Sequence, residues 1–224
     1  MLTRLKQFKE RHPFTALMMV AIFVRLIAVI FVPGFGSDND IQQPSLIQNF
    51  LDWLKEAIGL SGSRKVMIVS RMFYAFISLF TVAMIYRICD LLSNKSNAWI
   101  MALIPTICCI MPSFGIIENV SAFLGLPLVL YGSNIVLRQE VLRRANYTEN
   151  VHRSSFLIAG IMLGLGVCVW FESALIALSI LLVLLLKRNA KGALMTFIGI
   201  AFVLIIVYVL LLILKVNPLI FINI

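Results

Sequence analysis

The stretch that decides the fold covers residues 154–188 and reads SSFLIAGIMLGLGVCVWFESALIALSILLVLLLKR. Its only charged residue before the closing Lys187 and Arg188 is Glu172, near the midpoint. As one helix, these 35 residues would reach about 52 Å, which is far longer than one crossing of a hydrocarbon layer of about 30 Å. We therefore predict a hairpin of two shortened membrane helices with Glu172 at its submerged tip.

The rest of the chain also alternates apolar blocks with short polar links. Of its 224 residues, 61% are hydrophobic and 13% are charged, whereas a soluble domain is roughly half apolar and a quarter charged. Because backbone polar groups must be paired within hydrocarbon, each apolar block should be a helix. We predict an all-α fold, a polytopic membrane helical bundle of about seven spans that forms a single transmembrane domain over residues 1–224. The predicted spans are 14–32, 66–86, 97–113, 116–137, 155–171, 173–187 and 193–214.

The longest polar stretch, residues 33–65, follows the first predicted span. Within it, apolar residues recur at helical spacing, which predicts one amphipathic helix lying on the membrane surface in the first outer loop. These residues are Leu46, Ile47, Phe50, Leu51, Leu54 and Ile58.

The basic residues predict the orientation of the spans. Thirteen of the 19 fall in segments that this topology places in the cytoplasm, and only four fall on the opposite side. The thirteen are Arg4, Lys6, Lys9, Arg11, Arg87, Lys95, Arg138, Arg143, Arg144, Arg153, Lys187, Arg188 and Lys191. Because positive loops favour the cytoplasm, we expect a cytoplasmic N-terminus and interpret the net charge of +9 as a topology signal. The first span has no small-residue cleavage site after it and is expected to be a retained anchor.

Several carboxylates fall on the predicted outer face. Asp38 and Asp40 occupy the turn after the first span, while Glu118 and Glu172 lie at the tips of two hairpins. Carboxylates near a bilayer usually form ion pairs, line a wet cavity or take part in chemistry. The four could therefore line one cleft. Two simpler interpretations stay open: Asp38 and Asp40 belong to an ordinary solvated turn, and Glu118 and Glu172 are interfacial residues that reach water.

Two arginines lie inside predicted spans. Arg71 is near the outer end of its span and can snorkel, whereas Arg25 is about mid-span and needs a partner. That partner is either a carboxylate of a neighbouring helix, which would make Arg25 structural, or an anionic lipid headgroup.

Several motifs resemble a known family of membrane enzymes. They are a first span with Arg25, the turn Pro33-Gly34-Phe35-Gly36-Ser37-Asp38-Asn39-Asp40 before an amphipathic helix, the second span with Ser70-Arg71-Met72-Phe73-Tyr74-Ala75, the stretch from Met111-Pro112-Ser113 to Glu118-Asn119, and the closing Asn217-Pro218-Leu219-Ile220-Phe221. Over nearly its whole length the chain is similar to the first part of the GT-C superfamily of polyprenyl-phosphate-sugar-dependent glycosyltransferases, of the dolichyl-phosphate-mannose mannosyltransferase type. The likeness is greatest to bacterial members.

The resemblance implies a seven-span module of an enzyme that moves a sugar from a polyprenyl-phosphate donor to an acceptor on the non-cytoplasmic face. It implies that Asp38 or Asp40 is the catalytic carboxylate, acting as general base on an acceptor hydroxyl or positioning it. Glu118 would hold the second acidic position, in a loop that helps to bind the donor or a divalent metal ion. The substrate-binding set also includes the carboxylate of Glu172 on the same outer face. It further includes Arg64, Lys65, Arg71 and Arg25, since arginine and lysine suit phosphate oxygens.

The alternative is a non-catalytic or truncated GT-C-like membrane protein that binds a polyprenyl lipid or a partner membrane enzyme. A transporter or channel subunit is disfavoured, because the chain shows no internal repeat and few polar residues within the spans. The expected partners are a polyprenyl-phosphate-linked sugar and membrane lipids, with no nucleic acid and with a partner membrane protein left open. The expected location is the bacterial inner membrane, with the endoplasmic reticulum membrane as the alternative.

Overall fold

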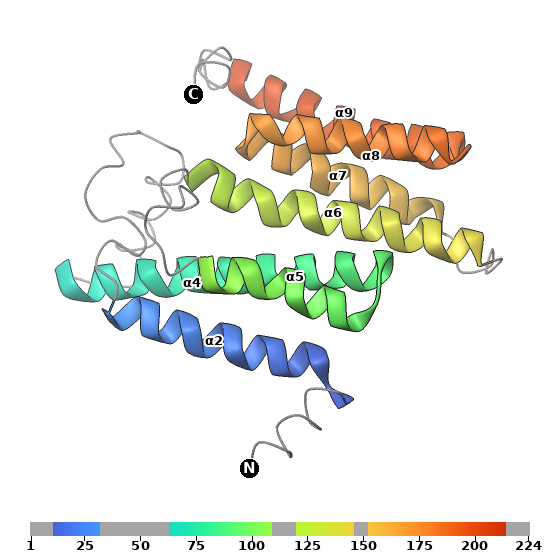
Figure 1. The fold of residues 1–224 in the computed structure, drawn as a ribbon. Coiled ribbons are helices and arrows are strands. Elements are labelled where there is room, and N and C mark those ends of the chain that lie inside the picture. Colours follow the sequence, from blue (N-terminus) through green and yellow to red (C-terminus); the bar gives the residue numbers. More distant parts are fainter. Residues whose placement is uncertain (1–10, 32–62, 109–119, 146–151, 214–224) are drawn as a thin grey trace. The chain divides into compact units, whose positions relative to one another are not determined.

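The computed structural model describes residues 11–31, 63–108, 120–145 and 152–213. Within these ranges it contains seven α-helices and one short 3-10 helix, and no strand (Figure 1). The prediction of an all-α fold is therefore confirmed for this part of the chain. The predicted amphipathic helix with Leu46 and Ile58 lies outside the described residues.

The helices match the apolar blocks closely. They are α2 (Pro13–Phe31), α4 (Ser63–Leu92), α5 (Lys95–Cys108), α6 (Val120–Arg144), α7 (Arg153–Val169), η3 (Phe171–Ser173), α8 (Ala174–Leu186) and α9 (Ala190–Ile213). Two short helices fill the stretch predicted as a hairpin, since α7 and α8 have 17 and 13 residues and meet at η3, and their insertion in a membrane stays a prediction.

Two helices extend beyond the apolar blocks that predicted them. The apolar block 66–86 lies in α4, which continues to Leu92, and the block 116–137 is followed in α6 by helix as far as Arg144. Hydropathy falls where charged residues begin, but arginine, leucine and glutamate are good helix formers, so the helix continues past that boundary.

The chain divides into two compact units. One contains α2, α4 as far as Ala83 and α5 from Trp99, and the other contains the end of α4 from Met84, the start of α5 to Ala98, and α6 to α9. The prediction of a single transmembrane domain over residues 1–224 stays a prediction.

In the second unit, α7 approaches α6 through glycines. A Cβ built on Gly132 of α6 would lie 2.9 Å from the carbonyl oxygen of Ala159, and one on Gly125 would lie 2.5 Å from the Cβ of Trp170. A Cβ on Gly166 of α7 would overlap the side chain of Val129. Small residues on facing surfaces therefore let the two backbones come close, as is common between membrane helices.

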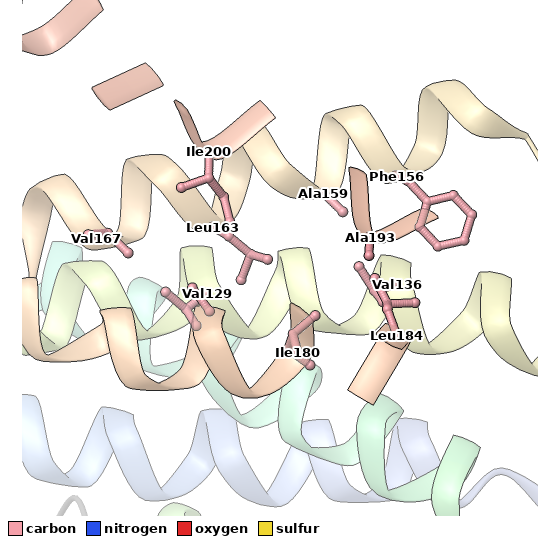
Figure 2. Packing of buried hydrophobic residues seen from close by; sticks show 11 residues of the cluster. Val129, Val136, Phe156, Ala159, Leu163, Val167, Ile180, Leu184, Ala193 and Ile200 are labelled. Carbon is pink, nitrogen blue, oxygen red and sulfur yellow. The ribbon is translucent and has the colours of Figure 1, made fainter. Parts of the chain in front are cut away.

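The opposite side of α7 packs against α9 in the same way. A Cβ on Gly160 would overlap the carbonyl oxygen of Thr196, and one on Gly199 of α9 would lie 2.5 Å from the carbonyl oxygen of Leu157. Between these contacts, apolar side chains from all four helices form one cluster (Figure 2). Its buried members are Val129, Val136, Phe156, Ala159, Leu163, Val167, Ala177, Ile180, Leu184, Ala193 and Ile200.

The large apolar side chains of α9 lie mostly on its exposed surface. Phe202 and Ile205 are 56% and 62% exposed, while Thr196 and Gly199 lie buried against α7. Two helical segments among the described residues, Ala75–Leu92 and Ala190–Leu210, are long and apolar enough to cross a membrane. An apolar exterior with small residues where the helices approach most closely is the pattern that hydrocarbon favours.

Candidate functional site

Three of the predicted carboxylates, Asp38, Asp40 and Glu118, lie outside the described residues. Arg64, Lys65 and Arg71 belong to the first turns of α4, and only their helical backbone is described. The predicted site residues whose side chains the structure describes are therefore Glu172 and Arg25, which belong to different units.

Glu172 lies at the corner between α7 and α8. After Val169, Trp170 adopts an extended conformation with φ −139° and ψ 97°, and η3 then leads the chain into α8. The exposed carboxylate accepts a hydrogen bond from the indole Nε1 of Trp170, with 3.0 Å between Nε1 and Oε2. A hydrogen bond to an ionised acceptor is stronger than a neutral one, so Trp170 holds Glu172 in a defined position at the tip of the apolar hairpin.

The backbone of this corner is also held in place. The amide of Trp170 donates to the Gly166 carbonyl at 2.8 Å, and the amide of Ser173 donates to the Trp170 carbonyl at 3.0 Å. The hydroxyl of Ser173 is fully buried and has no hydrogen-bond partner among the described residues. The corner thus presents a carboxylate and an indole outward and a serine hydroxyl inward.

Arg25 is buried among three helices of the first unit, with only 2% of its surface exposed. Its Nε donates to the Ser78 hydroxyl of α4. Its Nη1 donates to the carbonyl oxygens of Ala21, at 3.3 Å, and of Thr106 in α5, at 3.5 Å. The guanidinium therefore joins α2, α4 and α5 through hydroxyl and carbonyl oxygens.

A second polar cluster lies at the end of α6, around Glu140, which is only 4% exposed. Arg143 donates to both of its carboxylate oxygens, at 2.7 and 3.0 Å, and Arg144 lies 3.4 Å from Oε1. The Asn189 amide donates to Oε2 at 3.2 Å, and Arg143 also donates to the Lys187 carbonyl at 2.9 Å. Burial raises the pKa of Glu140, but the hydrogen bonds from Arg143 and Asn189 outweigh it and hold the pKa below its ordinary value.

Asn189 also organises the turn between α8 and α9. The backbone N–H of Asn189 donates to the Leu184 carbonyl at 2.9 Å, and the backbone N–H of Arg188 donates to the Leu185 carbonyl at 2.9 Å. These two bonds are the pattern of a Schellman C-cap. Its side-chain oxygen then accepts from the amide of Gly192 at 3.0 Å, so Asn189 caps the start of α9.

Of the predicted site residues whose side chains the structure describes, Arg25 belongs to the first unit and Glu172 to the second. No group of three or more histidine, cysteine, aspartate or glutamate residues within the part of the chain that the structure describes could hold a metal ion. The cluster around Glu140 was not predicted, although the spacing of Glu140, Arg143 and Arg144 is that of ion pairs on one helix face. The pairing of Trp170 with Glu172 depends on the extended conformation at Trp170, which the sequence pattern does not reveal. No family model, no curated protein and no solved structure matches this chain.

Proposed function

We propose that this chain is a multi-pass membrane protein of about seven spans, with its N-terminus in the cytoplasm, which transfers a sugar from a polyprenyl-phosphate donor on the non-cytoplasmic face. Two span-length helices and the outward-facing apolar side chains of α9 support the membrane assignment. The resemblance of the sequence motifs to the GT-C superfamily supports the reaction.

The observation that carries the proposal is the position of Glu172 beside Trp170. An ionisable residue within a membrane domain is expensive to keep and usually has a function. The indole N–H of Trp170 donates to one of the two carboxylate oxygens of Glu172 at the exposed corner. The other carboxylate oxygen of Glu172 can accept hydrogen bonds from sugar hydroxyls, and the indole ring beside it offers an apolar surface. Glu172 is therefore assigned to the binding of the sugar.

The other roles follow from the resemblance. Asp38 or Asp40 acts as general base on the acceptor hydroxyl while the sugar leaves its lipid phosphate, and Asp40 is favoured because it is nearer the predicted amphipathic helix. Glu118 contacts the donor, and Arg64, Lys65 or Arg71 binds the lipid phosphate. Of the two roles open for Arg25, its contacts with Ser78 and Thr106 support the structural one.

The test uses membranes that contain the full chain and supply the acceptor, with radiolabelled polyprenyl-phosphate-mannose as the donor probe. Asp38→Asn or Asp40→Asn should reduce transfer by about 10²–10⁴-fold, the usual contribution of a general base, while donor binding is retained. Glu118→Gln and Glu172→Gln should reduce transfer partially. Asp90→Asn, at an exposed carboxylate on the predicted cytoplasmic side, is the matched control and should leave transfer unchanged.

Two outcomes would count against the mechanism. Transfer at the wild-type rate by the Asp38→Asn, Asp40→Asn double variant would exclude these residues as the base. Donor binding without any transfer by the wild-type chain would favour the non-catalytic alternative.

A further inference from the structure

Three segments of the second unit meet at one end of its helices. Arg143, near the end of α6, donates to the Lys187 carbonyl in the α8–α9 turn. The amide of His152, just before α7, donates to the side-chain oxygen of Gln139 in α6 at 3.3 Å. The end of α6, the start of α7 and the α8–α9 turn therefore lie together, as Figure 1 also shows.

These segments carry six exposed cations, which we call the basic rim. Its members are Arg138, Arg144, Arg153, Lys187, Arg188 and Lys191. The one carboxylate that the structure describes in these segments is Glu140, which is buried and bound by Arg143, Arg144 and Asn189. Glu149 of the α6–α7 link lies outside the described residues. The outward-facing charge of these segments is thus strongly positive.

The backbone at Arg188 adds a second observation. Arg188 has φ 55°, the left-handed conformation that glycine normally supplies at this position of a helix cap. A residue with a Cβ is disfavoured in that conformation. Arg188 is exposed at this cap, so its cationic side chain projects from the α8–α9 turn.

Exposed apolar side chains adjoin the basic rim. Leu186 precedes Lys187 and is 72% exposed, and Leu194 follows Lys191 by three residues and is 57% exposed. The surface therefore pairs cations with large apolar groups. That combination matches a phospholipid, whose headgroup is anionic and whose acyl chains are apolar, better than it matches a nucleic acid.

We propose that the basic rim binds the headgroups of anionic phospholipids at the cytoplasmic surface of the membrane. Each phosphate meets arginine and lysine donors, while the acyl chains lie along exposed residues such as Leu186 and Leu194. The buried contacts of Glu140 fix the α8–α9 turn against α6 and so hold the cations together before a lipid arrives. The inference rests on the membrane placement in the proposed function and is independent of sugar transfer.

The test measures lipid retention by native mass spectrometry on the full chain in neutral detergent, titrated with phosphatidylglycerol or with phosphatidylcholine. The wild type should retain phosphatidylglycerol in preference to phosphatidylcholine. Lys187→Gln with Arg188→Gln should weaken phosphatidylglycerol binding about 30-fold, at roughly 1 kcal/mol for each cation near the surface. The double variant Arg11→Gln, Lys95→Gln removes the same charge from two exposed residues that belong to none of the three rim segments, and should weaken binding much less.

A second double variant, Arg153→Gln with Lys191→Gln, removes two cations from other parts of the rim and should weaken phosphatidylglycerol binding to a similar degree. Melting in detergent without added lipid identifies any variant that fails to fold. If one rim variant fails to fold, the other rim variant tests the proposal. Equal losses in the rim and control variants, or equal retention of the two lipids, would overturn the proposal. Inorganic phosphate or a short RNA oligonucleotide bound as tightly as phosphatidylglycerol would overturn it too.

Discussion

At the scale of single residues, Arg25 is a buried donor that serves acceptors on neighbouring helices. Its guanidinium donates to the Ser78 hydroxyl of α4 and to the Thr106 carbonyl of α5. The fork of donors in arginine allows one side chain to serve several acceptors at once. Three helices are thereby joined by one buried cation.

Replacing Arg25 with leucine should lower the free energy of unfolding by about 1–3 kcal/mol, because hydrogen bonds to a charged group are lost and the carbonyl oxygen of Thr106 loses a donor. The measurement is thermal unfolding of the full chain in detergent. Arg11→Leu, at an exposed arginine just before α2, should have little effect.

A double-mutant cycle separates this contact from a general loss of packing. The combined effect of Arg25→Leu and Ser78→Ala should be smaller than the sum of the single effects, because the two residues share one hydrogen bond. Additive effects would show that the contact does not stabilise the fold.

The carboxylate of Glu140 makes stability depend on pH. Its folded pKa is depressed, so its contribution is complete above its ordinary pKa of about 4.5 and is lost as the pH falls through the folded value. At pH 7, Glu140→Gln should therefore destabilise the protein by about 2 kcal/mol, through loss of the charged hydrogen bonds with Arg143.

The check is the difference in melting temperature between wild type and Glu140→Gln, measured from pH 7 down to pH 3. That difference should shrink below about pH 4.5. A constant difference across this range would mean that the charge of Glu140 contributes nothing. Asp90→Asn, at an exposed carboxylate, serves as the matched control.

At the scale of helices, hydropathy predicted that the apolar segments are helical, and the described parts of these segments are helical. The predicted spans 14–32, 155–171 and 193–214 overlap the helices Pro13–Phe31, Arg153–Val169 and Ala190–Ile213, and their bounds as membrane spans stay a prediction. The ends of α4 and α6 were not predicted, because a fall in hydropathy marks a change of environment rather than the end of a helix. At α6, the ion pairs of Glu140 with Arg143 and Arg144 support further helical turns.

The close packing of α7 against α9 predicts a graded response to added methyl groups. In an open helix, Gly→Ala stabilises by about 1 kcal/mol. At Gly160 the added Cβ would overlap the Thr196 carbonyl oxygen, so Gly160→Ala should separate the helices and lower the melting temperature.

Gly164 provides the matched comparison on the same face of α7. There the added Cβ would lie 3.0 Å from the Cβ of Val203 and 3.1 Å from the Ile200 carbonyl oxygen, so a small shift relieves it. Gly164→Ala should therefore cost far less than Gly160→Ala. Equal melting temperatures for the two variants would contradict the packing of α7 on α9.

At the scale of the whole molecule, contacts between residues far apart in the chain were the least predictable. The sequence showed that Arg25 needs a partner, but the acceptor at Thr106, 81 residues away, depends on how α5 packs against α2. The bond between Asn189 and Glu140 joins residues 49 positions apart, and no local pattern specifies it. The predicted catalytic residues Asp38 and Asp40 lie outside the described residues and stay a prediction.

The predicted topology can be tested with single cysteines in a background without Cys89, Cys108, Cys109 and Cys168. A cysteine at Ser61 should react with an impermeant thiol reagent added outside intact cells, whereas cysteines at Ser93 and Lys191 should react only after permeabilisation. Ser93 is exposed in the link between α4 and α5, and Lys191 is exposed in the first turn of α9. Labelling of the Lys191 position from outside would mean that α7 and α8 do not return the chain to the cytoplasm.

The glycines on both sides of α7 have a consequence for the timing of synthesis. Gly166 packs against α6, which is synthesised before α7. Gly160 and Gly164 pack against α9, which is synthesised after α7. Gly199, which faces Gly160, follows it by 39 residues, which at 5–20 residues per second takes about 2–8 s. For those seconds, one side of α7 exposes helix backbone that only the last described helix covers.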